Sequence, residues 1–338
     1  MNRRKRKYLI VLIIIFFSIQ AKSQKIGAKI DFFGYIDNRE FKATYTPPKT
    51  LFGTILSPQV YFELDNYNKL VTGIHYNQDF GNNIDNKNKL NAIAYYNYDK
   101  NGIDFGIGLI PRYEKLKDIP RLVLADTLMY DRPNIEGLYL EYNKNNKKQL
   151  LYIDWLNKQS HRYREQFVIG TTGLYKWGKL YFSNDGLLYH NSLSSNDSLG
   201  EHIQDNLVFT TNLGMDLSKN TFLDSLTIDI GAVFGFDRLR TVYEDKGIGF
   251  ISNLHLSYKS FFLKNTIYLG HALNLPNGDP FYKRKYYDRI DLGWKPFNTK
   301  HIEGRLTASF HFRKGGMDNQ QAFTLRYKFG QQLWSKKK

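Results

Sequence analysis

The sequence has 338 residues, of which 48 are lysine or arginine and 32 are aspartate or glutamate. It contains no cysteine, which excludes disulfides, thiolate metal sites and a cysteine nucleophile. Aromatic residues make up 16% of the chain and prolines number only 9, a balance that favours strands with aromatic belts.

The first 23 residues predict a secretory signal peptide. Basic residues Arg3 to Lys7 precede an apolar run from Tyr8 to Ile19, shorter than the roughly 20 residues that a membrane helix needs. Ala21 and Ser23 supply the small residues required for cleavage before Gln24. We therefore expect an exported protein with one domain, 24–338, whose basic surface meets lipid phosphates or anionic solutes and no nucleic acid.

Alternating apolar and polar residues predict sixteen strands in the rest of the chain. Two segments, 166–176 and 179–191, alternate poorly, so we expect a bulge in one of them. The strands are expected near residues 25–36, 53–64, 69–77, 90–98, 103–111, 135–142, 149–156, 166–176, 179–191, 207–216, 225–236, 250–258, 262–272, 288–295, 301–312 and 322–329.

The connections between these strands alternate in length. Short ones, such as 177–178 and 259–260, separate long ones, such as 112–134 and 192–206. This alternation is typical of a transmembrane antiparallel up-and-down β-barrel, an all-β fold with short periplasmic turns and long extracellular loops. We therefore predict about 16 strands with both chain ends in the periplasm.

The two faces of the predicted strands support the same fold. In 301–312 the residues Ile302, Leu306 and Phe310 alternate with charged and polar ones. A charged side chain facing lipid near the midplane costs about 2–4 kcal/mol, so the polar set must face the lumen. The residues predicted to line the pore are Lys29, Asp31, Glu63, Asp104, Asp154, Asp229, Arg289, Asp291, Glu303, Arg305, His311 and Arg326.

The last predicted strand, "AFTLRYKFG", has an aromatic, alternating face and resembles the C-terminal signal of bacterial outer-membrane barrels, although the chain continues to Lys338. The whole chain resembles porin-like outer-membrane barrels, and its richness in Lys, Asn, Tyr and Ile is similar to such proteins from Bacteroidetes. The resemblance implies the outer membrane of a Gram-negative bacterium. It also implies contact with outer-membrane lipids and lipopolysaccharide, and either a homo-oligomer or other envelope proteins as partners.

The third long connection is unusual because it is apolar in part, with Leu122, Val123, Leu124, Leu128 and Met129. These side chains need cover, and the third loop of sixteen-stranded general porins, which it resembles in position, folds into the pore. The alternative is that the connection packs on neighbouring loops and constricts nothing. The charged residues that would form a constriction are Arg112, Glu114, Lys115, Lys117, Asp118, Arg121, Asp126, Asp131 and Arg132.

An enzymatic reading begins at His190 and Ser192, two apart on one strand face predicted to be turned toward lipid. The pair resembles the outer-membrane phospholipase family, in which histidine is the general base and serine the nucleophile. Here Leu193-Ser194 replaces the Asn-Gly that follows the serine in that family. Ser309 and His311 have the same spacing, but we interpret them as pore lining.

The sequence predicts no cofactor and no metal site. The oxygen donors Asp79, Asn83, Asp85 and Asn88 could suit calcium, but their spacing departs from the EF-hand pattern and a solvated loop explains them. A barrel of sixteen strands is wide enough for an aqueous channel. We therefore predict a channel for passive or weakly selective passage of small solutes. The alternatives are a lipid hydrolase using His190 and Ser192, or a non-conducting scaffold barrel in secretion or surface-polysaccharide assembly.

Overall fold

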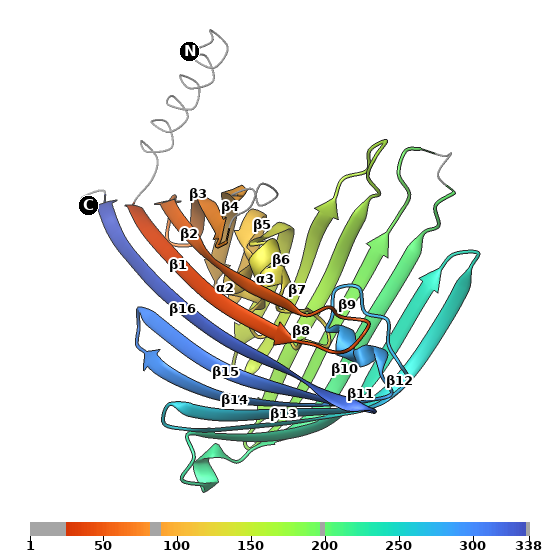
Figure 1. Cartoon of the computed structure of the whole chain (residues 1–338). Helices are drawn as coiled ribbons and strands as arrows, with labels where there is room; N and C mark the ends of the chain where they lie inside the picture. Colours follow the sequence, from red (N-terminus) through yellow and green to blue (C-terminus); the bar gives the residue numbers. More distant parts are fainter. Residues whose placement is uncertain (1–24, 82–88, 197–199, 336–338) are drawn as a thin grey trace.

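The structure is a computed structural model that describes residues 25–81, 89–196 and 200–335. Within these residues, sixteen antiparallel strands form one closed barrel, each paired with its neighbours in the chain, and the last strand pairs with the first (Figure 1). The predicted fold class is confirmed. No helix among the described residues is long and apolar enough to cross a membrane. The predicted signal peptide, 1–23, lies outside the described residues.

The strands agree closely with the predicted segments. The first eight are β1 Lys25–Glu40, β2 Lys49–Glu63, β3 Asn68–Asp79, β4 Lys89–Lys100, β5 Ile103–Pro111, β6 Asn134–Lys144, β7 Lys147–Asn157 and β8 Gln166–Trp177. The others are β9 Leu180–Asn191, β10 Gln204–Asp216, β11 Ser225–Leu239, β12 Tyr243–Tyr258, β13 Phe261–Gly270, β14 Tyr286–Asn298, β15 Ile302–Arg313 and β16 Gly316–Ser335.

The bulge that was expected in 166–176 or 179–191 lies elsewhere. Pairing between β8 and β9 runs without interruption from Gln166 to Trp177. The register instead shifts on β7, between Trp155 and Asn157. The poor alternation of β8 and β9 has a different cause, which is that polar side chains also lie on the outer surface of the barrel. Thr171 of β8, for example, accepts a hydrogen bond there from Gln149 of β7 at 2.6 Å.

The outer surface of the barrel is apolar. In β11, Ile228, Ile230 and Phe234 are among the exposed large hydrophobic residues, and Val233, on the opposite face, is buried in the interior. Trp177 and Trp294 lie near the short turns and Trp155 near a long loop, each of them exposed. Aromatic side chains at both ends of an apolar band are typical of a barrel that spans an outer membrane.

Among the described residues, four short helices lie in the connections. They are α2 Arg112–Leu116, α3 Leu128–Asp131, η2 Ser218–Asn220 and η3 Pro280–Lys283. Figure 1 shows α2, α3 and η3 within the ring of strands. The loops that carry them, which we call the β5–β6 loop (112–133) and the β13–β14 loop (271–285), turn inward and bring apolar residues with them. The largest buried apolar cluster therefore lies inside the barrel, between these loops and inward-facing residues such as Leu187, Val208 and Ile251.

Candidate functional site

The β5–β6 loop is attached to the inner wall through α2. Glu114 accepts a hydrogen bond from Lys29 of β1 at 3.0 Å, and Lys115 donates to Asp104 of β5 at 2.5 Å. The ring of Tyr113 lies under the guanidinium of Arg326 of β16, 3.5 Å from its central carbon. Contacts to β1, β5 and β16 hold this short helix against the inner wall of the barrel.

The first residue of α2, Arg112, forms an ion pair with Asp154 of β7, and both side chains are almost completely buried. Arg112 also donates to the carbonyl oxygens of Arg132 at 2.8 Å and Asn134 at 2.7 Å. The second oxygen of Asp154 accepts from the amide of Glu136 at 2.8 Å. Full hydrogen bonding allows two opposite charges to be buried together. Asp154, predicted to line the pore, is therefore covered by α2.

The apolar part of the β5–β6 loop contacts the β13–β14 loop inside the barrel. Leu122, Val123 and Leu124 belong to the same buried cluster as Leu275 and Phe281. Two backbone hydrogen bonds join the loops, from the amide of Ala125 to the oxygen of Asn277 at 2.7 Å and from the amide of Asp279 to the oxygen of Arg121 at 2.9 Å. The loops together narrow the lumen.

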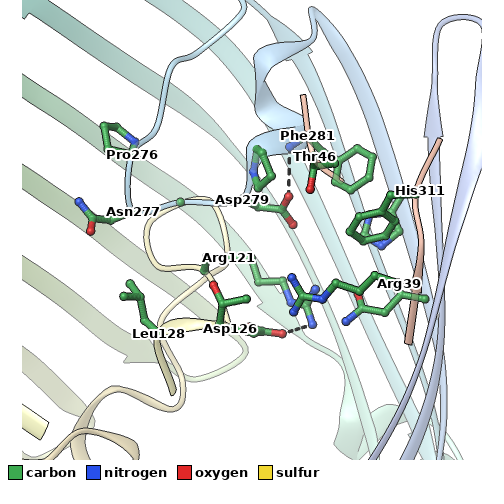
Figure 2. A pocket seen from close by; sticks show the side chains of 16 residues that line it. Arg39, Thr46, Arg121, Asp126, Leu128, Pro276, Asn277, Asp279, Phe281 and His311 are labelled. Atoms are coloured by element: carbon green, nitrogen blue, oxygen red, sulfur yellow. Dashed lines mark hydrogen bonds and ion pairs between the residues drawn. The ribbon is translucent and has the colours of Figure 1, made fainter. Parts of the chain in front are cut away.

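A pocket of about 270 Å³ lies where these two loops meet the β1–β2 loop (41–48) and the wall. Figure 2 shows its side chains converging from all of these elements. The polar residues that line it are Arg39, Thr46, Arg121, Asp126, Thr127, Asn277, Asp279, His311 and Gln320.

The charges around this pocket occur in pairs. Arg39 donates to Asp37 through Nε at 3.1 Å and Nη2 at 2.6 Å, and Arg121 forms an ion pair with Asp126. Asp279 accepts from the amide of Phe281 at 3.1 Å and so caps η3. Burial, opposed by the nearby Arg121, raises the pKa of Asp279 to about 6.

His311 of β15 forms the wall behind this pocket. Its Nδ1 shares a hydrogen bond with the hydroxyl of Tyr287 at 2.8 Å, and its ring stacks on Phe281 at 4.3 Å between ring centres. The side chain is 1% exposed, and its Nε2 has no hydrogen-bond partner among the described residues. His311 is therefore not a simple pore-lining side chain in contact with water.

Most other residues predicted to line the pore face the interior in oppositely charged pairs. Asp31 accepts from Arg326 at 2.6 Å, Asp291 from Arg289 at 2.7 Å, and Glu303 from Arg305 at 3.3 Å. Asp229 accepts from Tyr181 and Asn253, both at 2.8 Å. Glu63 lies at the end of β2, 3.2 Å from Lys25. Ser309 accepts from Arg289 at 3.0 Å.

The remaining charged residues of the β5–β6 loop do not all point at the lumen wall. Arg132 donates to the oxygen of Leu156 at 3.0 Å. Lys117, Asp118 and Asp131 are exposed. The loop therefore divides into a half attached to the wall by ion pairs and an exposed set that borders solvent.

Sequence reasoning missed the contribution of the β13–β14 loop and of Arg39. No role was assigned to this loop from the sequence, but its segment "LNLPNGDPFY" brings Leu275 and Phe281 into the interior. Its apolar residues were the same signal that singled out 112–133. No sequence pattern pointed to Arg39, because it becomes part of the pocket only through contact with loops that are distant in the sequence.

His190 lies on the outer face, at the end of β9 beside one of the long loops. Its Nδ1 is 2.8 Å from Asp205, which also accepts from Arg238 at 2.7 Å and Arg240 at 3.0 Å. The described residues include no hydrogen bond between the side chains of His190 and Ser192. The backbone of Ser192 is instead fixed by its amide, which donates to the oxygen of Glu165 at 2.8 Å.

Asp79 accepts a hydrogen bond from Tyr35 at 3.0 Å. Asn83, Asp85 and Asn88, the other oxygen donors of that loop, lie outside the described residues. The described part of the chain contains no group of three or more His, Cys, Asp or Glu side chains arranged to hold a metal ion.

Comparison with known proteins gives one family and many barrels of the same fold. The family model "Lipid A 3'-O-deacylase-type" matches residues 19–336. No curated protein matches the sequence.

Similar solved structures are outer-membrane barrels. A loop-deletion form of OmpT from Vibrio cholerae has a TM-score of 0.56 at 10% identity, covering 90% of this chain and 99% of that one. The anion-selective porin from Comamonas acidovorans has a TM-score of 0.54 at 11% identity, covering 90% and 98%. The outer membrane protein opdK from Pseudomonas aeruginosa has a TM-score of 0.52 at 10% identity, covering 91% and 100%. At such low identity these similarities establish the fold alone.

Proposed function

This chain belongs to the lipid A 3'-O-deacylase-type family, and from its interior we propose that it acts as an outer-membrane channel for passive or weakly selective passage of small polar solutes. The observation that carries this proposal is a water-bordered lumen narrowed by two inward loops. Arg305 and Glu303 face the interior, and yet their side chains are 38% and 39% exposed. Side chains that point inward and remain this exposed border water, as expected of an aqueous passage.

The inner wall also supports a weak preference for anions. Lys264 faces the interior opposite Asp291, and Lys295 and Arg305 flank the buried ring of Phe262 at 5.7 Å and 5.6 Å. Neither Lys264 nor Lys295 forms an ion pair with another described residue. These cations lower the electrostatic barrier for anions that pass along this wall.

The experiment is single-channel recording of the refolded chain from Gln24 to Lys338 in a planar lipid bilayer with asymmetric salt. Stable steps with a reversal potential displaced toward the anion side are expected. A folded barrel that never conducts would contradict the proposal and would favour a scaffold barrel that works through other envelope proteins.

A lipid hydrolase is the second candidate, and the contact of His190 with Asp205 at 2.8 Å favours it. Asp205 would orient the imidazole, His190 would act as general base, and Ser192 would attack an acyl ester of an outer-leaflet lipid. Arg238 and Arg240 beside Asp205 would meet the phosphates of lipopolysaccharide. The backbone around Ser192 would have to rearrange, because its side chain forms no hydrogen bond with that of His190 among the described residues.

The hydrolase reading is tested with purified lipid A and phospholipid in mixed micelles. Release of fatty acid by the natural sequence, lost in Ser192→Ala and in His190→Ala, would support it. Release that persists in both variants would remove this pair from the reaction.

The proposal includes removal of the signal peptide, residues 1–23. We expect export with cleavage before Gln24, because Ala21 and Ser23 precede that bond. The intact mass of the protein from outer-membrane fractions measures this. A mass that includes residues 1–23 would show that the leader is retained.

A further inference from the structure

We propose that the pocket between the β1–β2, β5–β6 and β13–β14 loops binds a small, neutral, polyhydroxylated solute of monosaccharide size. This inference rests on the proposed channel, for which the pocket would be a selective step. Its volume of about 270 Å³ corresponds to roughly nine water molecules at about 30 Å³ each. It has room for one compact solute of monosaccharide size.

The pairing of charges argues against an ion as the preferred ligand. Arg39 is neutralised by Asp37 through two hydrogen bonds, and Arg121 by Asp126. An anion would have to compete with a carboxylate already bound to each guanidinium, and a cation with a guanidinium already bound to each carboxylate. A zwitterion would face both kinds of competition, because its anionic group would compete for the guanidinium groups and its cationic group for the carboxylates.

The same paired groups have hydrogen-bonding capacity to spare. A guanidinium has five N–H donors and a carboxylate about four acceptor positions, so the ion pairs of Arg39 and Arg121 leave several unused. Thr46 and Gln320 add a hydroxyl and an amide to the lining. A hydroxyl group both donates and accepts, and a ligand with several of them matches such a mixed lining.

Two buried nitrogen atoms in the lining have no partner among the described residues. They are Nε2 of His311 and Nδ2 of Asn277. With Nδ1 of His311 engaged by Tyr287, either tautomer leaves Nε2 with one hydrogen bond to make. A buried polar atom without a partner costs about 1–3 kcal/mol, and a bound hydroxyl group could remove this cost.

Apolar groups complete the match. Phe41 and Phe281 line the pocket beside Pro276 and Pro280, and the two rings meet edge to face at 5.1 Å. A sugar presents C–H faces as well as hydroxyl groups, so one ligand can use both kinds of surface. Figure 2 shows the ring of Phe281 beside His311 at one end of the pocket and Asn277 at the other.

The test is isothermal titration of the refolded chain with D-glucose, D-galactose and D-mannose, with sodium acetate and glycine as charged and zwitterionic probes. At least one hexose is expected to bind more tightly than both, and to interrupt single-channel current. Asn277→Ala should raise the dissociation constant of that hexose about tenfold. Lys283→Ala, exposed on the same loop, is the matched control and should leave it unchanged.

Each outcome decides one claim. Conductance without binding of any hexose, or tighter binding of acetate or glycine, would overturn the inference and leave the channel standing. Absence of conductance would overturn the channel. Hexose binding unchanged by Asn277→Ala and by His311→Gln would place the ligand outside this pocket and overturn the inference.

Discussion

Nζ of Lys29 lies 3.0 Å from Oε1 of Glu114, although 85 residues separate them in the sequence. The pair joins β1 to the inward helix α2. Burial opposes ionisation of Glu114, but Lys29, Lys328 and Lys115 outweigh it and hold its pKa below the ordinary value. Glu114 therefore stays charged over the physiological pH range, and the contact with Lys29 persists.

Reversing one charge of this pair should loosen the β5–β6 loop. Lys29→Glu places two carboxylates together, so we expect larger and noisier single-channel conductance. The exchange Lys29→Glu with Glu114→Lys should restore quiet currents, because the attraction is rebuilt. The side chains are partly exposed, so the energy involved is no more than about 1 kcal/mol and stability should change little. Single-variant currents identical to those of the natural sequence would show that this contact does not position the loop.

The pair of Arg112 and Asp154 should matter far more for stability. Arg112→Ala would leave a buried carboxylate alone, at a cost of about 3–5 kcal/mol. Urea unfolding of the refolded barrel, followed by tryptophan fluorescence, measures this cost. Lys117→Ala, an exposed residue of the same loop, is the control and should change the free energy of unfolding by less than about 0.5 kcal/mol. Equal effects of the two substitutions would refute the importance of the buried pair.

Ion selectivity should depend on Arg305. Arg305→Glu turns a lumen cation into an anion, and we expect the reversal potential to move toward cations while the barrel stays folded. Lys300→Glu makes the same change of charge in the exposed short turn between β14 and β15 and should have a weaker effect. An unchanged reversal potential in Arg305→Glu would remove this residue from the ion path.

The contact between the two inward loops should weaken as pH rises through about 6. The pKa of Asp279 is raised to about 6, so the folded loop binds a proton more tightly than the unfolded chain does. The stabilisation is therefore complete below the ordinary carboxyl range and is lost as pH rises through 6. Hydrogen exchange at the amides of Ala125 and Asp279 should be slower at pH 4.5 than at pH 7.5, after correction for intrinsic rates.

Asp279→Asn supplies the control for this pH dependence. An amide does not titrate, so the difference in protection between the two pH values should disappear. A difference of the same size in the variant would assign the effect to another group.

The barrel could be predicted because the membrane constrains the polarity of each residue on its strands. Side chains such as Ile230 and Phe234 must face lipid and neighbours such as Asp229 must not, so most strands, with β8 and β9 as exceptions, carry an alternating pattern of their own. For loop 112–133 the sequence predicted only that Leu122, Val123 and Leu124 need cover, because exposing them to water is costly, and it left open whether the loop enters the pore or packs on its neighbours. Strand periodicity and the apolar character of a loop are local properties, so they can be recognised in a single sequence.

The pocket could not be predicted from local sequence patterns. Arg39, Asp279 and His311 come from β1, a loop and β15, and no spacing connects them. His190 and Ser192 were found as a local motif, but the described residues include no hydrogen bond between their side chains, so whether they act together depends on the loop that follows Ser192.

The sequence by itself determined the strands, the lipid-facing side of each strand and the alternation of short turns and long loops, because hydrophobic periodicity is encoded between neighbours. Only the tertiary structure decided which charges meet inside the barrel and where the loops leave a pocket. Closing β1 against β16 brings together residues nearly 300 positions apart, as in the contact of Asp31 with Arg326, and those partners are set by the closed geometry of the barrel.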